Sequence, residues 1–385
     1  MFDLIVVGGG VLGAFHAYHA LKNGLKVALI EKDKAPQGAT VRNFGQVVPS
    51  GMNEKWQTYG RESLEIYKEI HAQVDLTIRN QGTIYLASDP EEMQLLEELR
   101  EINSSKDYTS TLISKENCLK KYPGLRPDYI KGGLYFPQEL TVEPRLMIKR
   151  LLQAMVLDMG LIYKPDTSVH SCENTGSLVK TSTACGQKLK SSKVIVCNGS
   201  EFKTLYPAIF AGSNMEISKL QMMQTKIQPK SFHLPGSILT GTSIRRYEAF
   251  QECPSYHTIK ENERKDSPEK KWGIHILFKQ AMDGSVILGD SHEYASVENR
   301  NSLGFDLKVE IDELMLKMAG QIFDLPSYEI AYRWYGIYSQ CKNGEVFDKT
   351  IDNNIHIVTG IGGKGMTGSP AFAKENIFKL FNLQQ

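Results

Sequence analysis

The first thirty residues contain the strongest constraint on the fold, a glycine-rich turn between two apolar segments. Residues 2–7 form a short apolar run with β-branched side chains, and GGGVLG follows at positions 8–13 in G-x-G-x-x-G spacing. Apolar residues then recur at helical spacing, Gly24 ends the helix, and residues 26–30 resume a strand that stops at Glu31. The sequence therefore predicts a β–α–β unit with a tight turn before its helix.

This unit is suited to hold the diphosphate of a dinucleotide. Gly8 permits the sharp turn, Gly10 lets the backbone approach a pyrophosphate, and Gly13 lets the helix lie close to the strand. The free N–H groups at the helix start favour a negative charge there. The carboxylate of Glu31 can accept hydrogen bonds from ribose hydroxyls, and it disfavours a 2′-phosphate. The predicted contacts of this unit are Gly8, Gly10, Val11, Leu12, Gly13, Glu31 and Lys32. Flavin and nicotinamide cofactors share the motif, so both stay open at this point.

Length and composition indicate two globular domains and exclude several partners. The chain has 385 residues, of which 41% are apolar and 23% charged, and its 45 basic residues nearly cancel its 44 acidic ones. There is thus no polybasic field for nucleic acid. Six scattered cysteines without zinc spacing favour reduced thiols and no metal site. With no signal-peptide pattern and no membrane-length apolar window, we expect a cytoplasmic protein without integral membrane association.

The C-terminal region decides between the two cofactors. Residues 355–359 form an apolar strand, and a second glycine loop and a terminal helix follow. A nicotinamide needs no second helix start, whereas the N1–C2=O2 edge of a flavin becomes anionic on reduction and is stabilised by N–H groups and a helix dipole. We therefore predict FAD. The predicted ring contacts in this loop are Gly362, Gly363, Lys364, Gly365, Met366 and Thr367.

Two further segments are predicted to return to the cofactor. A polar loop after the first unit suits a second set of contacts to a long cofactor, and the apolar strand VIVCNGS ends in a glycine turn. The predicted contacts in these segments are Thr40, Arg42, Asn43, Phe44, Gly45, Asn198 and Gly199.

Between these segments the pattern of apolar and polar residues changes. Residues 215–330 alternate between apolar and polar positions and contain turns such as Asp283-Gly284, which favours an antiparallel sheet. The charged stretch 260–271 is interpreted as a solvated loop. We predict an α/β protein, α+β overall, with a Rossmann-like FAD domain assembled from discontinuous segments and an antiparallel-sheet substrate domain. The FAD domain comprises residues 1–75, 140–215 and 331–385, and the substrate domain comprises residues 76–139 and 216–330.

Taken in order, these segments resemble the family of D-amino acid oxidase, glycine oxidase and sarcosine oxidase. The resemblance rests on VVGGGVLG with Glu31, ATVRNFGQ, VIVCNGS, DGSVILGDS, RWYGIY and VTGIGGKGMTGSPA. It implies oxidation of the C–N bond of a small amine or amino acid by hydride transfer to flavin N5. The imine would then hydrolyse, and oxygen or another acceptor would reoxidise the flavin. NFGQVVPSG and TSIRRYEAF resemble a subgroup linked with aminophosphonate breakdown.

The resemblance also suggests individual residues. It implies that Val169 contacts adenine through its backbone and that Gly336 lies near the cofactor. Tyr338 stands where family members that act on α-amino acids often carry a carboxylate-binding arginine. Cys341 lies past the position of the cysteine that tethers flavin in sarcosine oxidases, so we expect noncovalent FAD.

The positive charge for an acidic substrate could instead come from Arg245 or Arg246. Both follow the apolar segment SILTGTSI, which we interpret as a strand, so at most one of them points inward. The predicted catalytic residues are thus Tyr338, Arg245 and Arg246. His275 and His292 are interpreted as packed or surface residues, because hydride transfer from a neutral amine does not demand a base.

Two other functions stay open at this stage. One is a nicotinamide-linked dehydrogenase that uses only the first motif, and the other is a nonenzymatic protein that binds FAD for structure or regulation. The sequence leaves the oligomeric state undetermined.

Overall fold

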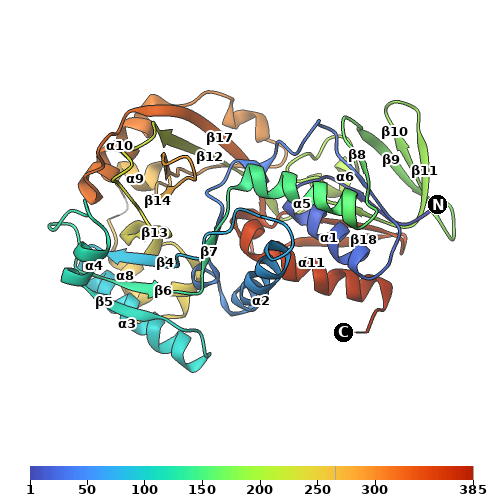
Figure 1. The fold of residues 1–385 in the computed structure, drawn as a ribbon. Coiled ribbons are helices and arrows are strands. Elements are labelled where there is room, and N and C mark those ends of the chain that lie inside the picture. The colour runs from blue at the N-terminus through green and yellow to red at the C-terminus, as the bar shows by residue number, and fades with distance from the viewer. Residues whose placement is uncertain (265, 385) are drawn as a thin grey trace.

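The computed structural model describes residues 1–264 and 266–384, which form two lobes side by side (Figure 1). Lys265 of the charged stretch 260–271 and Gln385 at the end of the third FAD segment lie outside the described residues. Each lobe is built on one large sheet. The mixed α/β architecture with both parallel and antiparallel pairing confirms the predicted fold class.

The sheet of the first lobe has the strand that precedes the glycine-rich turn near its centre. Its strand order is β18-β19-β11-β1-β2-β8, and β9 and β10 extend it from β11. The bounds are β1 (Phe2–Val7), β2 (Val27–Ile30), β8 (Ile162–Lys164), β9 (Val169–Asn174), β10 (Val179–Thr183), β11 (Lys188–Val196), β18 (Phe347–Ile351) and β19 (Ile355–Thr359). Because β1 pairs in parallel with β2 and β11, and β11 with β19, the predicted return of distant segments to one sheet is confirmed.

The helices of this lobe pack on one another through buried polar contacts as well as apolar ones. They are α1 (Val11–Lys22), α2 (Glu54–His71), α5 (Pro144–Asp158), α6 (Pro207–Ala211) and α11 (Gly365–Phe381). The terminal helix α11 crosses beneath α1 in Figure 1. His16 Nε2 lies 2.9 Å from Asn376 Nδ2, His19 Nε2 lies 2.9 Å from Pro370 O, and Tyr67 donates to Met366 O at 2.9 Å. These bonds fix the C-terminal helix against the first motif.

The sheet of the second lobe has nine strands in the order β16-β12-β15-β14-β13-β4-β6-β5, with β17 also paired to β12. The bounds are β4 (Thr83–Ala87), β5 (Thr111–Ser114), β6 (Gly132–Phe136), β12 (Met215–Thr225), β13 (Ser237–Thr240), β14 (Leu277–Gln280), β15 (Val286–Gly289), β16 (Glu293–Ser296) and β17 (Ile330–Cys341). All its described pairs are antiparallel except β13 with β4. The predicted antiparallel sheet is present.

Strand β17 belongs to the second lobe, whereas the predicted domain division places it in the FAD domain. It was assigned to the third FAD segment, but it pairs with β12 from Met215↔Cys341 to Thr225↔Ile330. The physical reason is the length of β12, whose eleven residues offer a continuous partner. Sheet membership therefore extends the second lobe through Cys341.

Two segments of the second lobe have a different local structure from the one predicted. The strand predicted through SILTGTSI ends at Thr240, and the chain turns into α7 (Gly241–Ile244) and then a 3-10 turn. The charged stretch interpreted as a loop contains the end of α8 (Tyr256–Asn262) and the whole of α9 (Pro268–Lys271). The other helices here are α3 (Pro90–Ser105), α4 (Lys115–Lys121) and α10 (Val309–Ile322). Among residues 1–264 and 266–384, no helix combines the length and apolarity needed to span a bilayer.

A buried carboxylate lies beside the two short strands that link the lobes, β3 (Gln46–Val47) and β7 (Leu140–Thr141). Glu139 has no exposed surface, and its Oε1 accepts from the Ser50 backbone N–H at 2.7 Å and from the Tyr108 hydroxyl at 2.9 Å. Burial raises the pKa of Glu139 to about 7, although these donors oppose the shift. The folded protein therefore binds this proton more tightly than the unfolded chain does.

Replacing Glu139 with glutamine should change how stability depends on pH. The stability that comes from the raised pKa is fully present below about pH 4.5 and is lost as pH rises through about 7. Glutamine keeps an oxygen for both donors and has no charge to desolvate. We expect the variant to gain up to about 3 kcal/mol over wild type at pH 8 and little at pH 5. Denaturant unfolding of both proteins at pH 5 and pH 8 measures this. An equal difference in unfolding free energy at the two pH values would refute a raised pKa for Glu139.

Candidate active site

A cavity of about 810 Å³ is lined by residues of both lobes. Its walls include the glycine turn after β1, the loop before α11, and side chains of the second sheet. These are the segments from which the sequence predicts a cofactor site and a substrate site. The cavity therefore brings the two together.

The glycine turn is held by close backbone contacts. The Gly8 N–H donates to Ile30 O at 2.8 Å, and Gly8 has a φ of +106°, which favours glycine. A Cβ on Gly13 would lie 2.0 Å from Gly8 O, so only glycine lets α1 approach β1 this closely. A Cβ on Gly10 would meet only Thr40 Oγ1, at 3.1 Å, and Gly10 lines the cavity. The space beside Gly10 is thus a cradle that any side chain would partly fill.

Glu31 closes this end of the cavity, as predicted for the ribose side. It is only 6% exposed, and its two oxygens accept from the backbone N–H groups of Gly9 at 2.8 Å and Asp33 at 3.0 Å. Each oxygen keeps a second lone pair for a ligand hydroxyl. Thr40 accepts from the Val11 N–H at 2.9 Å and so tethers the second loop to the helix start.

Three buried polar atoms on the cavity wall lack hydrogen-bond partners within the described part of the chain. One is Asp290 Oδ1, in the cluster described below, and the other two are Gln46 Nε2 and Asn198 Oδ1. Buried polar atoms are normally satisfied, so these two point to a bound molecule with complementary groups. Together with the cradle at Gly10 and the helix start of α1, they fit a dinucleotide that extends along the cavity.

The loop before α11 forms another part of the wall. It contains a 3-10 turn at Gly362–Lys364, and α11 begins at Gly365, where Lys364 supplies no side-chain cap. Thr367 Oγ1 accepts from the Val48 N–H at 3.1 Å. The Lys364 ammonium donates to Glu248 Oε1 at 2.6 Å and to Gly344 O at 3.0 Å. Its charge is therefore largely neutralised by a carboxylate.

The structure brings nearly all of the predicted site residues together. The cavity is lined by Gly8, Gly10, Val11, Leu12, Gly13, Glu31, Lys32, Thr40, Arg42, Asn43, Phe44, Gly45, Val169, Asn198, Gly199, Gly362, Gly363, Lys364, Gly365, Met366, Thr367, Tyr338 and Arg246. Two predicted residues, Gly336 and Arg245, do not line it. The individual cofactor contacts stay predictions, because lining a cavity is not the same as binding.

Arg245 forms ion pairs outside the cavity. Its guanidinium bonds to Glu92 at 3.0 Å, Asp89 at 2.7 Å and Glu91 at 2.9 Å, and Glu263 lies 3.7 Å away. The prediction of a substrate role for Arg245 is therefore corrected to a structural one. The physical reason is that the chain turns into α7 instead of continuing as a strand, which directs this arginine toward the start of α3.

Gly336 has a packing role. A Cβ at this position would lie 2.5 Å from the ring of Tyr338, two residues along β17. Tyr338 itself is buried on the cavity wall, and burial raises the pKa of its phenol above the ordinary value. Cys341, farther along β17, is not among the cavity-lining residues.

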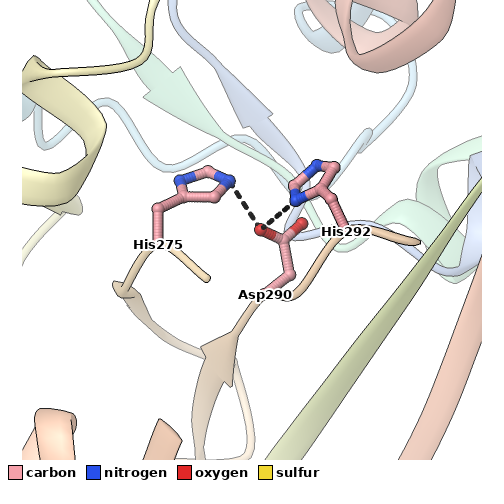
Figure 2. A group of neighbouring side chains, drawn as sticks. All are labelled: His275, Asp290 and His292. Atoms are coloured by element: carbon pink, nitrogen blue, oxygen red, sulfur yellow. Dashed lines mark ion pairs between the residues drawn. The ribbon is translucent and has the colours of Figure 1, made fainter. Parts of the chain in front are cut away.

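Three residues that the sequence analysis did not assign to the site lie together on the cavity wall. Figure 2 shows His275 and His292 on either side of Asp290. His275 Nε2 lies 2.6 Å from Asp290 Oδ1, and His292 Nδ1 lies 3.8 Å from the same oxygen. The imidazoles stack with centroids 5.2 Å apart. Their ligand atoms all lie within 4.8 Å of one another, so the group could also hold a metal ion, contrary to the expected absence of a metal site.

The hairpin β14–β15 places this cluster. Leu277 pairs with Gly289, so the residues just before β14 and just after β15 meet at one end of the hairpin. The turn Asp283-Gly284, read from the sequence, already implied such a hairpin. Extending its register would have brought His275 beside residues 290–292.

Charge within the cluster is set by burial and by neighbours. Burial would raise the pKa of Asp290, but His275, His292 and Arg246 together hold it below its ordinary value. Burial lowers the pKa of His292 to about 3, despite the attraction of Asp290. At neutral pH the cluster therefore contains an ionised carboxylate beside an uncharged His292.

Arg246 supplies a cation to the same wall. Its guanidinium donates to the Tyr294 hydroxyl at 2.6 Å. Within the described ranges, no carboxylate oxygen lies within 4.0 Å of this guanidinium, in contrast to its neighbour Arg245. Arg246 can therefore bind a negatively charged group in the cavity.

The fold and the cavity define a dinucleotide-dependent oxidoreductase. Residues 3–376 match the model of the FAD dependent oxidoreductase family, and the chain belongs to that family. It is thus an FAD-dependent enzyme, which removes the nicotinamide-linked and nonenzymatic alternatives.

Relatives and neighbouring structures differ in what their names say they oxidise. A glycerol 3-phosphate dehydrogenase of Caloramator mitchellensis is 30% identical over 395 residues, covering 100% of this chain and 74% of the relative. The mitochondrial sarcosine dehydrogenase of Mus musculus is 25% identical over 183 residues, which are 46% of this chain but only 19% of that longer protein. The crystal structure of glycine oxidase from Geobacillus kaustophilus aligns with a TM-score of 0.79 at 15% identity, covering 100% of this chain and 95% of that one. This last likeness shows the fold.

Filling the cradle at Gly10 should weaken cofactor binding without unfolding the protein. In Gly10→Ala the new methyl group meets only a hydroxyl oxygen of the protein and otherwise occupies cavity space. We expect FAD affinity to fall at least about tenfold, since a displaced diphosphate loses several charge-assisted bonds. Flavin content of the purified protein, read from the ratio of visible to ultraviolet absorbance, measures this.

Gly320→Ala in α10 is the matched control, because a Cβ there has no neighbour within 4 Å in the described structure. It should keep a full complement of FAD. Normal FAD binding by Gly10→Ala would show that the diphosphate lies elsewhere.

Proposed function

We propose that the enzyme oxidises the C–N bond of a small amine that also carries an acidic group, with an aminophosphonate as the preferred candidate. The observation that carries this proposal is Arg246, a guanidinium on the cavity wall without a carboxylate partner among the described residues. A guanidinium binds phosphonate or carboxylate oxygens in a bidentate manner. The resemblance of NFGQVVPSG and TSIRRYEAF to an aminophosphonate-linked subgroup supports the phosphonate.

The residues of the chain bind and orient the substrate for this reaction. When bound, FAD supplies the acceptor for the hydride, which carries the two electrons of the oxidation. Arg246 would hold the acidic group, while the buried Tyr338 and the partly buried Tyr247 form parts of the wall that exclude water. Fixing the acidic end leaves the amine-bearing carbon with few orientations, which is the main demand of hydride transfer. The electron acceptor, oxygen or another, and the cytoplasmic location stay predictions.

A second candidate is oxidation of the C–O bond of a glycerol phosphate. It is favoured by the 30% identity to the dehydrogenase of Caloramator mitchellensis. Both candidates would place an anionic phosphorus group on Arg246, and the reacting heteroatom, nitrogen or oxygen, distinguishes the two reactions. A test must therefore vary that atom.

Anaerobic titration of the yellow holoenzyme tests the two candidates. The panel comprises glycine, sarcosine, D-amino acids, 2-aminoethylphosphonate, its N-methyl derivative and sn-glycerol 3-phosphate. We expect an amine with an acidic group to bleach the flavin band, and glycerol 3-phosphate to leave it unchanged. Bleaching by glycerol 3-phosphate alone would replace the proposal with the second candidate, and a flavin that no amine reduces would refute it.

Arg246→Gln should raise the Michaelis constant of the substrate found in that titration. A charge-assisted hydrogen bond contributes about 1.5–3 kcal/mol, so the increase should be roughly 10- to 150-fold, with a smaller change in kcat. Arg245→Gln is the neighbouring control, because Arg245 faces acidic residues outside the cavity. It should lower thermal stability and leave the Michaelis constant within about threefold. The reverse pattern would return the substrate role to Arg245.

A further inference from the structure

Asp290 is a buried carboxylate without a well-directed hydrogen-bond donor. It is 6% exposed and lines the cavity, and its Oδ1 has no hydrogen bond from any described residue. His275 Nε2 is within ion-pair distance at 2.6 Å, but the contact lacks hydrogen-bond geometry. An ionised carboxylate in this state is costly unless something donates to it. The wall therefore presents an anionic acceptor that the protein itself leaves unsatisfied.

The groups that face Asp290 come from several elements. His275 and His292 flank it, and Arg246, Tyr247 and Tyr338 are close enough to interact with its charge. Among them Arg246 carries the positive charge that remains open to a ligand, and it is not ion-paired with Asp290. Two opposite charges that are not paired with each other thus line one cavity. A molecule with both an ammonium and an acidic group would neutralise both.

A metal ion is a less suitable occupant of the cluster. Two atoms bound tetrahedrally to one zinc ion at about 2.0–2.1 Å are separated by roughly 3.3 Å. The 2.6 Å between His275 Nε2 and Asp290 Oδ1 is shorter, as expected for a direct contact. The carboxylate is therefore better suited to a donor that approaches from the cavity.

We propose that Asp290 selects an amine over an alcohol, because its carboxylate binds the substrate ammonium. This inference rests on the proposed amine oxidation.

An alcohol has no charge for Asp290 to neutralise. A glycerol phosphate would bring its anionic group to Arg246 but leave the carboxylate desolvated beside an uncharged hydroxyl. Asp290 would therefore lower the affinity for hydroxyl analogues and raise it for ammonium analogues that carry the same acidic group. Replacing Asp290 should remove this discrimination.

Calorimetric binding to the holoenzyme tests the inference without turnover. The protein is first reduced with dithionite under anaerobic conditions, so that no ligand is oxidised. Two matched pairs are titrated: 2-aminoethylphosphonate with 2-hydroxyethylphosphonate, and glycine with glycolate. We expect wild type to prefer the amine of at least one pair about tenfold or more. Asp290→Asn should lose that preference, because its affinity for the amine falls at least tenfold while the hydroxyl compound binds equally well or better.

Asp312→Asn is the control, because Asp312 is a similarly buried carboxylate that bonds to Gln221 and Arg333 and does not line the cavity. It should keep the preference of wild type. The inference would be overturned if wild type showed no preference for the amine or if Asp290→Asn kept the wild-type preference. It would also be overturned if Asp290→Asn lost affinity equally for the amine and the hydroxyl compound. Stoichiometric metal in the purified holoenzyme that disappears in Asp290→Asn would also overturn it. None of these results depends on flavin bleaching, so the outcome is distinguishable from failure of the proposed reaction.

Discussion

The approach of α1 to β1 is the contact on which the cofactor side of the molecule depends. With a Cβ at Gly13 only 2.0 Å from Gly8 O, the helix could not start where it does. The same helix start touches the start of α11, because a Cβ at Gly365 would lie 3.6 Å from Val11 Cγ1. Two helix N-termini that are more than 350 residues apart in the chain therefore meet at one cavity. Each helix start carries a partial positive charge, so this end of the cavity favours an anionic ligand.

The distribution of charge separates the structural part of the cavity wall from the part left for a substrate. Arg42 donates to the carbonyl oxygens of Gln37 and Tyr335, and Lys364 is paired with Glu248. These cations are satisfied by the protein and hold loops in place. Arg246 and Asp290 differ, because neither is satisfied by an opposite charge through a directed bond in the described residues. Leaving both unsatisfied costs free energy, and binding a complementary ligand recovers it.

Sequence reasoning can place residues on the cavity wall where the wall is built from local motifs. Gly10 and Glu31 line the cavity as the motif predicts, because a strand, a turn and a helix in register leave few alternatives for the backbone. The sequence did predict that at most one of two neighbouring arginines points inward, but it could not tell which one. Arg245 and Arg246 are adjacent and chemically identical, and only the turn into α7 sends one to the acidic residues of α3 and the other to the cavity. No periodicity in the sequence signals that turn.

The positions of Asp290 and His275 on the cavity wall depend instead on strand register. Asp290 stands at the end of an apolar strand in a position that looks like an ordinary turn, and its partner His275 precedes a different strand. Their meeting follows from the pairing of Leu277 with Gly289 in the hairpin whose loop contains Asp283-Gly284. Because a slip of one residue would turn every side chain of the strand to the other face, the packing that fixes the sheet also fixes the charge in the cavity. If Asp290 and Arg246 recognise the substrate as proposed, the specificity of the enzyme depends on the register of β14 and β15 as much as on the chemistry of the residues they carry.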